Sequence, residues 1–262
     1  MKFFLKTAIK SIIIKLRMQK MAYAFFNIYA YFFRYQTVMR DGITYSLDLR
    51  ESVDRGIFLL GWEPLTISWL NKNLKIGDVV IEVGANIGAH SLIMSSIIGP
   101  DGSLYCFNPS LPENSRLFQT YVSNSKNTKS DHKIRSSWII NKTDEITNEM
   151  DEDFDGEIVV LDVFFADLEK LDFIKIDVDG FDFKVLQGSK NIIIKHKPVI
   201  FIELGERDLN KNGDSVMDII NFFNDIGYSG VLESGEAIST GEALMKILES
   251  SSHTNGIFSS TS

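Results

Sequence analysis

A glycine-containing turn after an apolar run is the part of this chain whose residue types and spacing point most directly to chemistry. The run 79–83 is apolar except for Glu82. The candidate cofactor-binding residues of the turn that follows are Gly84, Ala85, Asn86 and Gly88. A continuously apolar run is typical of a strand buried on both faces of a parallel sheet, and nucleotides bind at glycine turns at the carboxyl ends of such strands. We therefore expect Glu82 and the turn to bind a nucleotide-type cofactor.

The glycine spacing argues against a dinucleotide. A dinucleotide fingerprint reads G-x-G-x-x-G, and its second glycine lets the backbone approach a pyrophosphate. Here the pattern is Gly84-x-x-x-Gly88 with Asn86 inside, so the middle glycine is missing. A cofactor without a pyrophosphate needs only N–H groups at a helix start for one small anion, such as an amino-acid carboxylate. S-adenosylmethionine fits this description, and a turn that only reverses the chain is the structural alternative.

Asn108 follows the predicted strand 103–107 and is our candidate for the ribose of the cofactor. In nucleotide sites of this topology the residue at the end of the second strand meets the ribose hydroxyls, and a carboxylate is preferred because it accepts both hydrogen bonds. An asparagine accepts one bond and donates one, so it can still hold a ribose. The alternative is an Asn-Pro turn that ends the strand.

Carboxylates at two other strand ends are our catalytic candidates. Asp177 ends the predicted strand 173–177, and Asp179 follows it closely. Since the carboxyl ends of parallel strands share one crevice, we expect both beside the cofactor, which Asp177 would also contact, or beside the acceptor, where a carboxylate orients or deprotonates a hydroxyl. The alternative is that they form a turn or cap the next helix. Glu203, which ends the strand 198–203, is then the better candidate.

Strands and helices alternate along the chain, which predicts an α/β doubly wound sheet with right-handed crossovers. The expected strands are 79–83, 103–107, 173–177 and 198–203, with a closing pair around 230–232 and 256–259. The expected helices are 65–74, 87–98, 112–124, 182–196 and 214–226. We assign residues 41–262 to this one domain.

The charge is distributed unevenly. Residues 1–40 carry eight Lys or Arg and no acid, whereas residues 41–262 carry 19 basic and 35 acidic groups, net −16. Such an acidic body repels a nucleic-acid backbone, so we expect no nucleic acid among its partners. The single cysteine, Cys106, excludes a disulfide framework and favours a cytoplasmic location.

Residues 1–40 are predicted to form a basic amphipathic helical extension. Their longest charge-free run, 21–33, has 13 residues and is too short to span a bilayer. One interpretation is peripheral contact with an anionic membrane surface. The other, which we favour, is that the aromatic face packs on the catalytic body or on a second subunit.

An acidic segment offers a metal hypothesis. Residues 144–157 hold eight acids in fourteen positions, and Asp151, Asp153, Asp155 and Asp162 match the ligand spacing of a calcium loop. The final position is Asp rather than Glu and the flanking helices are weak, so we interpret the segment as a solvated loop and assign no metal.

The motifs together resemble the FkbM family of S-adenosylmethionine-dependent methyltransferases. The resemblance extends from Gly42 to about Ser260, and its most specific parts are the motifs Glu82–Gly88 and Ile174–Gly180. It implies a class I, Rossmann-like fold, mainly parallel with an antiparallel closing strand. It also implies methyl transfer to a small-molecule or glycan acceptor, typically to an oxygen of a sugar, a glycolipid or a related metabolite. The family usually has Glu where Asn108 stands, so the alternative is a degenerate fold that acts as a binding or scaffold subunit.

Overall fold

The computed structural model describes residues 26, 28–40, 42–59, 61–108, 131–139, 157–238, 241–249 and 253–261. Side chains are described for these residues except Asn108, 131–139, 157, 158 and 241. The chain forms two compact units, Met1–Trp62 and Glu63–Ser262. The boundary lies after Trp62 rather than after residue 40, because the segment before residue 40 pairs with a strand beyond it.

The first unit contains a two-stranded antiparallel sheet and a short helix. β1 (Tyr35–Arg40) pairs with β2 (Ile43–Asp48), and α2 (Ser52–Leu59) follows. The expectation of a helical extension is therefore wrong for Tyr35–Arg40, whose Tyr, Thr and Val favour a strand that can pair. Residues 1–25 lie outside the described residues. Among the described helices, none is long and apolar enough to cross a bilayer.

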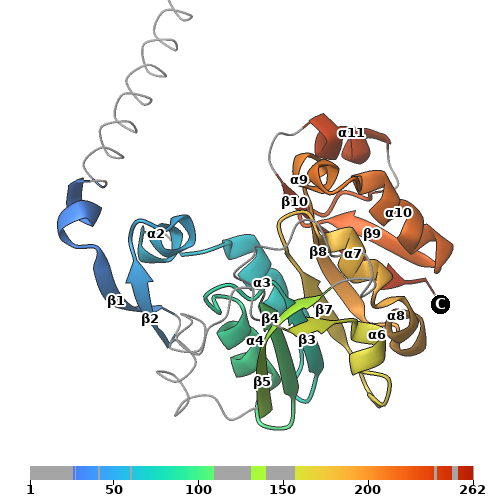
Figure 1. Ribbon diagram of the computed structural model, residues 1–262, viewed down its shortest axis with the longest axis horizontal. Coiled ribbons are helices and arrows are strands. Elements are labelled where there is room, and N and C mark those ends of the chain that lie inside the picture. Colours follow the sequence, from blue (N-terminus) through green and yellow to red (C-terminus); the bar gives the residue numbers. More distant parts are fainter. Residues whose placement is uncertain are drawn as a thin grey trace, which may run out of the picture. The chain divides into compact units, whose positions relative to one another are not determined.

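The second unit is built on an eight-stranded sheet in the order β6-β5-β4-β3-β7-β8-β10-β9 (Figure 1). All neighbours from β6 to β8 are parallel, and β10 is antiparallel to both β8 and β9. This confirms the prediction of a mainly parallel sheet with an antiparallel closing strand. The strands are β3 (Val79–Val83), β4 (Ser103–Asn108), β5 (Asp131–Ile139), β6 (Glu157–Val159), β7 (Phe173–Ile176), β8 (Val199–Leu204), β9 (Tyr228–Leu232) and β10 (Thr254–Ser260).

Helices cover both faces of this sheet, as the doubly wound prediction requires. On one face, Val80, Phe173 and Phe201 of the strands pack with Leu70 and Met94, which belong to the first two helices of this second unit. On the other face, strand residues that alternate with these, such as Ile81 and Ile174, pack with the later helices. The helices are α3 (Pro64–Asn73), α4 (Ser91–Ile98), α6 (Leu161–Phe164), α7 (Asp182–Gln187), α8 (Lys190–His196), α9 (Glu206–Lys211), α10 (Val216–Asp225) and α11 (Gly241–Glu249).

Most predicted elements of this unit are present among the described residues, but two predicted helices have different bounds, and β5, α6, α9 and α11 were not predicted. α4 begins at Ser91 rather than at residue 87, because Gly88 has a φ of +83° that a helix excludes. The predicted helix 182–196 is two helices, α7 and α8, separated at Gly188 and Ser189. The predicted helix 112–124 lies outside the described residues.

Candidate active site

The glycine turn after β3 lies against the loop after β7. Gly84 has a φ of +91°, and Asn86 between the two glycines has a φ of +49°. A Cβ at Gly84 would overlap the carbonyl oxygen of Asp177. Glycine is therefore required here both by conformation and by close backbone approach. The structure thus brings two of the predicted site segments together at the carboxyl edge of neighbouring parallel strands.

Three N–H groups of this turn are engaged within the protein. The Gly84 and Ala85 N–H groups donate to the Phe107 carbonyl, at 2.9 and 3.2 Å, and the Gly88 N–H donates to the Ala85 carbonyl at 2.8 Å. These donors are therefore not available to a carboxylate in this structure, contrary to our expectation. Contact of the cofactor with the turn residues stays a prediction that rests on their position.

Glu82 is buried under the turn. Its side chain accepts a hydrogen bond from the Ser91 hydroxyl, and the Cys106 thiol lies 3.7 Å from the same oxygen. Burial is the main cause that raises the pKa of Glu82. With 1% of its surface exposed, Glu82 ties β3 to the start of α4. This places it behind the turn as a positioning residue.

Lys175 and Asp177 form an ion pair whose lysine we did not predict as a site residue. Lys175 Nζ donates to Asp177 Oδ2 at 2.7 Å, and the lysine side chain is 2% exposed whereas the aspartate side chain is 34% exposed. Burial opposes the charge of the ammonium, but Asp177 and Glu82 outweigh it and raise the Lys175 pKa. Burial likewise opposes the ionised form of Asp177, and Lys175 outweighs it, so that the Asp177 pKa is lowered. Asp177 is therefore an ionised carboxylate of low basicity.

His90 has a buried nitrogen that no described group satisfies. Its Nε2 lacks a hydrogen-bond partner among the described residues, and its nearest acid, Glu63 Oε2, lies 3.7 Å away. Burial, followed by the Lys175 charge, lowers the His90 pKa to about 3, so the imidazole is neutral. Glu63 precedes α3 with a left-handed φ of 42°, and its Oε2 lies 3.1 Å from the Thr66 hydroxyl. A buried unpaired nitrogen of this kind is costly and points to a group that completes it.

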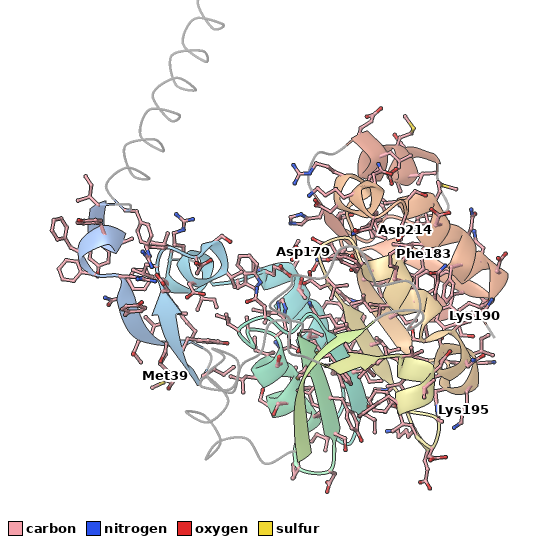
Figure 2. All side chains as sticks on the ribbon, in the orientation of Figure 1. Met39, Asp179, Phe183, Lys190, Lys195 and Asp214 are labelled. Atoms are coloured by element: carbon pink, nitrogen blue, oxygen red, sulfur yellow. The ribbon has the colours of Figure 1, made fainter. Side chains whose placement is uncertain are left out.

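The loop after β7 is held by a residue that we did not predict. The Asp182 carboxylate accepts hydrogen bonds from the Val178 and Gly180 N–H groups at 3.2 and 3.0 Å. Burial, and then the Asp177 charge, raise the Asp182 pKa to about 7. Asp179 is exposed at this edge with a φ of +49° (Figure 2). The loop-capping role suggested as the alternative for Asp177 and Asp179 thus belongs to Asp182.

Comparison with known proteins identifies the family. The family model described as "Methyltransferase FkbM domain" matches residues 82–229, which is more than half of the chain. The chain belongs to the FkbM methyltransferase family. The match includes the glycine turn, Lys175, Asp177 and Glu203. A search of curated proteins returned no match.

Solved methyltransferase structures are similar to this FkbM chain at low identity. An FkbM methyltransferase from Methylobacillus flagellatus KT is 17% identical over 71% of this chain and 45% of that one, with a TM-score of 0.49. This chain therefore spans less than half the length of that relative. A SAM-dependent methyltransferase from Aquifex aeolicus is 12% identical, covering 80% of this chain and 95% of that one, with a TM-score of 0.43. M. jannaschii TYW2, solved in complex with AdoMet, is 10% identical over 86% and 84% of the two chains, with a TM-score of 0.45.

Glu203 of β8 lies close enough to Lys175 and to the aspartates of the β7–α7 segment for their charges to shift its pKa. Its side chain is 14% exposed, and its Oε1 lies 3.4 Å from His253 Nδ1. Burial is the main cause that raises the Glu203 pKa to about 8, and the nearby Asp177, Asp182 and Asp179 add to it. Glu203 is therefore a carboxyl group whose protonation changes near neutral pH.

Two predicted features fall partly outside what the structure describes. Asn108 ends β4, as predicted, but its side chain lies outside the described residues, so the ribose contact stays a prediction. Residues 151–156 of the calcium hypothesis also lie outside. Asp162, its last position, accepts hydrogen bonds from the Asn191 and Ile192 N–H groups at 3.0 and 2.8 Å and so caps α8. The described residues contain no group of three acids, histidines or cysteines able to hold a metal ion.

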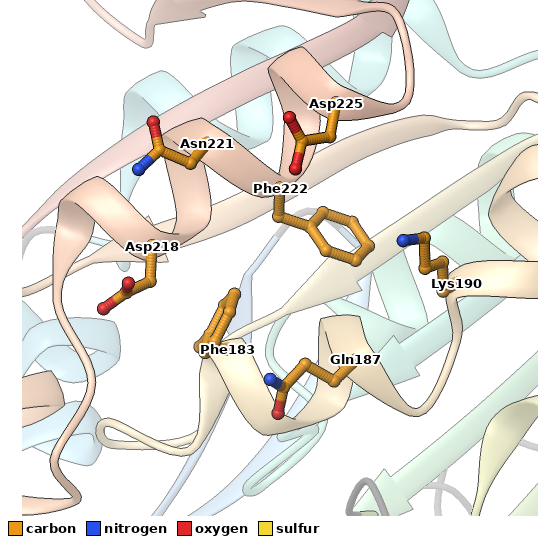
Figure 3. Close-up of a pocket in the computed structure, with 7 residues that line it drawn as sticks. All are labelled: Phe183, Gln187, Lys190, Asp218, Asn221, Phe222 and Asp225. Carbon is orange, nitrogen blue, oxygen red and sulfur yellow. The ribbon is translucent and has the colours of Figure 1, made fainter.

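A separate cavity of about 430 Å³ opens between α7, α8 and α10. Its lining residues are Phe183, Gln187, Lys190, Asp218, Asn221, Phe222 and Asp225 (Figure 3). Lys190 Nζ lies 5.9 Å from the centre of the Phe222 ring. None of the predicted site residues lines this cavity, so it is distinct from the carboxyl edge of β3 and β7.

Proposed function

We propose that this FkbM methyltransferase uses S-adenosylmethionine to methylate a hydroxyl group of a sugar, a glycolipid or a related metabolite. The observation that carries the proposal is the cluster of partly neutralised acids at the carboxyl edge of the parallel strands. The charge of Lys175 lowers the pKa values of three acids, Glu63, Asp177 and Glu203, and burial opposes this effect at each of them. Such an edge is where nucleotide-type cofactors bind in this class of fold.

The charges of the cluster fit a cationic cofactor. Burial raises the pKa of Glu63, and the acids near Glu203 raise its pKa further, so the cluster carries more acid than its buried cation neutralises. A bound positive charge would stabilise the ionised forms of these acids. Asp177 and Glu63 would face the positive groups of the cofactor, and the residues of the turn 84–88 would contact its methionine part. When bound, S-adenosylmethionine supplies an electrophilic methyl group.

Three side chains have distinct tasks in this proposal. Asp177, held ionised by Lys175, orients the hydroxyl and is too weakly basic to take its proton. Neutral His90 offers its unpaired Nε2 for a hydrogen bond to another polar atom of the bound acceptor or cofactor. Glu203 is our candidate for the general base, because a pKa of about 8 matches proton uptake near neutral pH.

Two measurements on the full chain test this function. Calorimetry with S-adenosylmethionine should show binding, and cell extract with labelled cofactor should identify the fraction that receives the methyl group. Glu203→Gln should lower turnover about 10²- to 10⁴-fold, the usual contribution of a general base, with little effect on cofactor affinity. The control Glu242→Gln changes an exposed acid on α11 and should keep both properties.

The outcomes separate enzyme from scaffold. A folded chain that binds no cofactor would support the alternative of a degenerate methyltransferase fold that acts as a binding subunit. Cofactor binding together with full turnover of the Glu203→Gln variant would instead remove Glu203 from the catalytic residues and leave the methyltransferase proposal intact.

A further inference from the structure

The first unit exposes a group of large apolar side chains. We call this group the aromatic face, and its members are Ile28, Tyr31, Phe32, Phe33, Tyr35 and Met39. Each is more than half exposed, with Tyr31 at 80% and Met39 at 72%. Tyr35 and Met39 lie at alternate positions of β1, so they share one side of that strand. Met39 is labelled in Figure 2, where its side chain points away from the strands.

The aromatic face is joined to a small apolar interior of its own unit. The rings Phe26, Tyr29 and Phe58 have their centres 6.1 to 6.2 Å apart, and Phe33 of the aromatic face stacks on Tyr29 at 4.9 Å. Ala30, next to the exposed Tyr31, is only 4% exposed. The other side chains of the aromatic face are apolar surface beyond what this interior requires, and an exposed set of this size marks an interaction surface.

The charge of the first unit is opposite to that of the rest of the chain. Residues 1–62 contain ten basic and four acidic residues, net +6, and residues 63–262 contain 17 basic and 31 acidic residues, net −14. All four acids lie after residue 40, and one of them, Asp48, is paired with Arg34 at 2.6 Å. The Arg34 guanidinium also lies 4.6 Å from the centre of the Tyr35 ring. Residues 1–40 contain no acidic residue. A segment that combines exposed aromatic side chains with basic residues complements an anionic lipid surface.

The second unit of another copy of the chain is a poorer match for this face. The exposed large apolar residues of the described part of that unit lie on six different elements and one turn: Leu65, Ile76, Val163, Ile194, Met217, Val231 and Met245. No described element of that unit therefore presents an apolar counterpart, although its acidic charge would attract the basic segment. A lipid surface supplies both the apolar layer and the negative charge.

We propose that the aromatic face docks this protein on an anionic membrane surface. The rings and Met39 insert at the level of the lipid headgroups, where amphipathic rings are favoured, and the net positive charge of the first unit is attracted to the anionic surface. The acidic second unit is repelled by the same surface. This docking is independent of the reaction proposed above.

Sedimentation of the full chain with lipid vesicles tests the docking. We expect binding to vesicles of phosphatidylcholine with phosphatidylserine, weaker binding to phosphatidylcholine alone, and a decrease with added salt. The triple variant Tyr31→Ser, Phe32→Ser, Met39→Ser should lower the partition coefficient about tenfold or more, since each apolar side chain loses its burial in lipid. The control Ile76→Ser, Val163→Ser, Met245→Ser changes equally exposed apolar residues of the second unit and should bind as the wild type does.

Three results would overturn the proposal. They are no binding to phosphatidylserine vesicles, an equal loss in both triple variants, and a wild-type dimer in ultracentrifugation that the aromatic triple variant dissolves while vesicle binding is unchanged. Circular dichroism checks that the variants fold. If the aromatic triple variant does not fold, the single variants Tyr31→Ser and Met39→Ser decide, each with an expected decrease of about threefold.

Discussion

The Lys175→Met variant removes a buried ammonium group and keeps a side chain of similar length. In the wild type, Lys175 Nζ lies 2.7 Å from Asp177 Oδ2. Two unit charges at this separation attract each other by about 6 kcal/mol at an effective dielectric constant of about 20, before the opposing cost of desolvation. Removing one partner of a fully buried pair typically costs about 3–5 kcal/mol, because the other charge stays buried without compensation. The Asp177 side chain is 34% exposed and keeps contact with water, so the loss should be about 2–3 kcal/mol. We expect this loss in the free energy of unfolding at neutral pH.

The loss should shrink in acid. In the wild type, Lys175 overcomes the effect of burial and holds the Asp177 pKa below its ordinary value. The pair therefore stabilises the fold above the pKa of an unfolded aspartate, about 3.9, and this contribution is lost as the pH falls through the lower folded pKa. Without Lys175, burial raises the Asp177 pKa, so the penalty in the variant grows as the pH rises above about 4. The difference between the two proteins is thus largest near pH 7 and smaller near pH 4, where the penalty in the variant has gone. It is lost fully only below the folded pKa of Asp177.

Urea denaturation at these two pH values measures the effect. Lys175→Met, Asp177→Asn and the double variant complete a cycle, and we expect the double variant to be about 3 kcal/mol more stable than the sum of the single effects predicts. The control Lys246→Met breaks an exposed pair with Glu236 and should leave the stability nearly unchanged. A loss below about 1 kcal/mol for Lys175→Met, or an equal loss at both pH values, would refute the reasoning.

Two further predictions concern stability and use the same denaturation assay. Gly84→Ala should cost about 3 kcal/mol because it adds a backbone overlap to the strain of a positive φ, whereas the control Gly235→Ala, with a φ of +92° and no atom near the added Cβ, should cost about 1–2 kcal/mol. Equal costs would show that the approach of the turn to the β7–α7 loop is not tight. Asp162→Ala should cost about 1–2 kcal/mol by removing the cap of α8, and the exposed control Asp167→Ala should cost less than about 0.5 kcal/mol. Indistinguishable values for the two aspartates would contradict the capping role.

The sheet could be predicted because its strands are short apolar runs with glycine turns. The predicted strand 79–83 has the bounds of β3, and the two closing strands β9 and β10 include the predicted segments 230–232 and 256–259. The break between α7 and α8 was not predicted, because it depends on a distant residue, Asp162, which caps the second helix. Likewise β1 was interpreted as part of an amphipathic helix, although its Tyr, Thr and Val favour a strand once β2 is there to pair with it.

The loops of the site could be predicted from the sequence, but the buried side chains Lys175 and His90 were not. The turn at Gly84 and the carboxylate of Asp177 follow strand ends, which a single sequence shows. Lys175 carried a signal that we did not use: it lies two residues before Asp177 in a strand that is otherwise apolar, so the two side chains share a face. His90 carried no such signal. The acid beside it, Glu63, is separated from it in the sequence by α3 and β3.

The acids at the carboxyl edge of β7 and β8 lower the stability of the fold at neutral pH. Burial and neighbouring acids raise the pKa of Asp182 to about 7 and of Glu203 to about 8, so the folded state binds more protons than the unfolded chain at intermediate pH. Each of these groups therefore destabilises the fold progressively as the pH rises from about 4 towards the folded pKa. Backbone N–H groups offset part of this cost at Asp182, and Lys175 offsets part of it at Glu203. A fold selected for stability alone would replace such acids by apolar residues, so their place at the carboxyl edge of β7 and β8 favours a positively charged ligand as the group that completes the site.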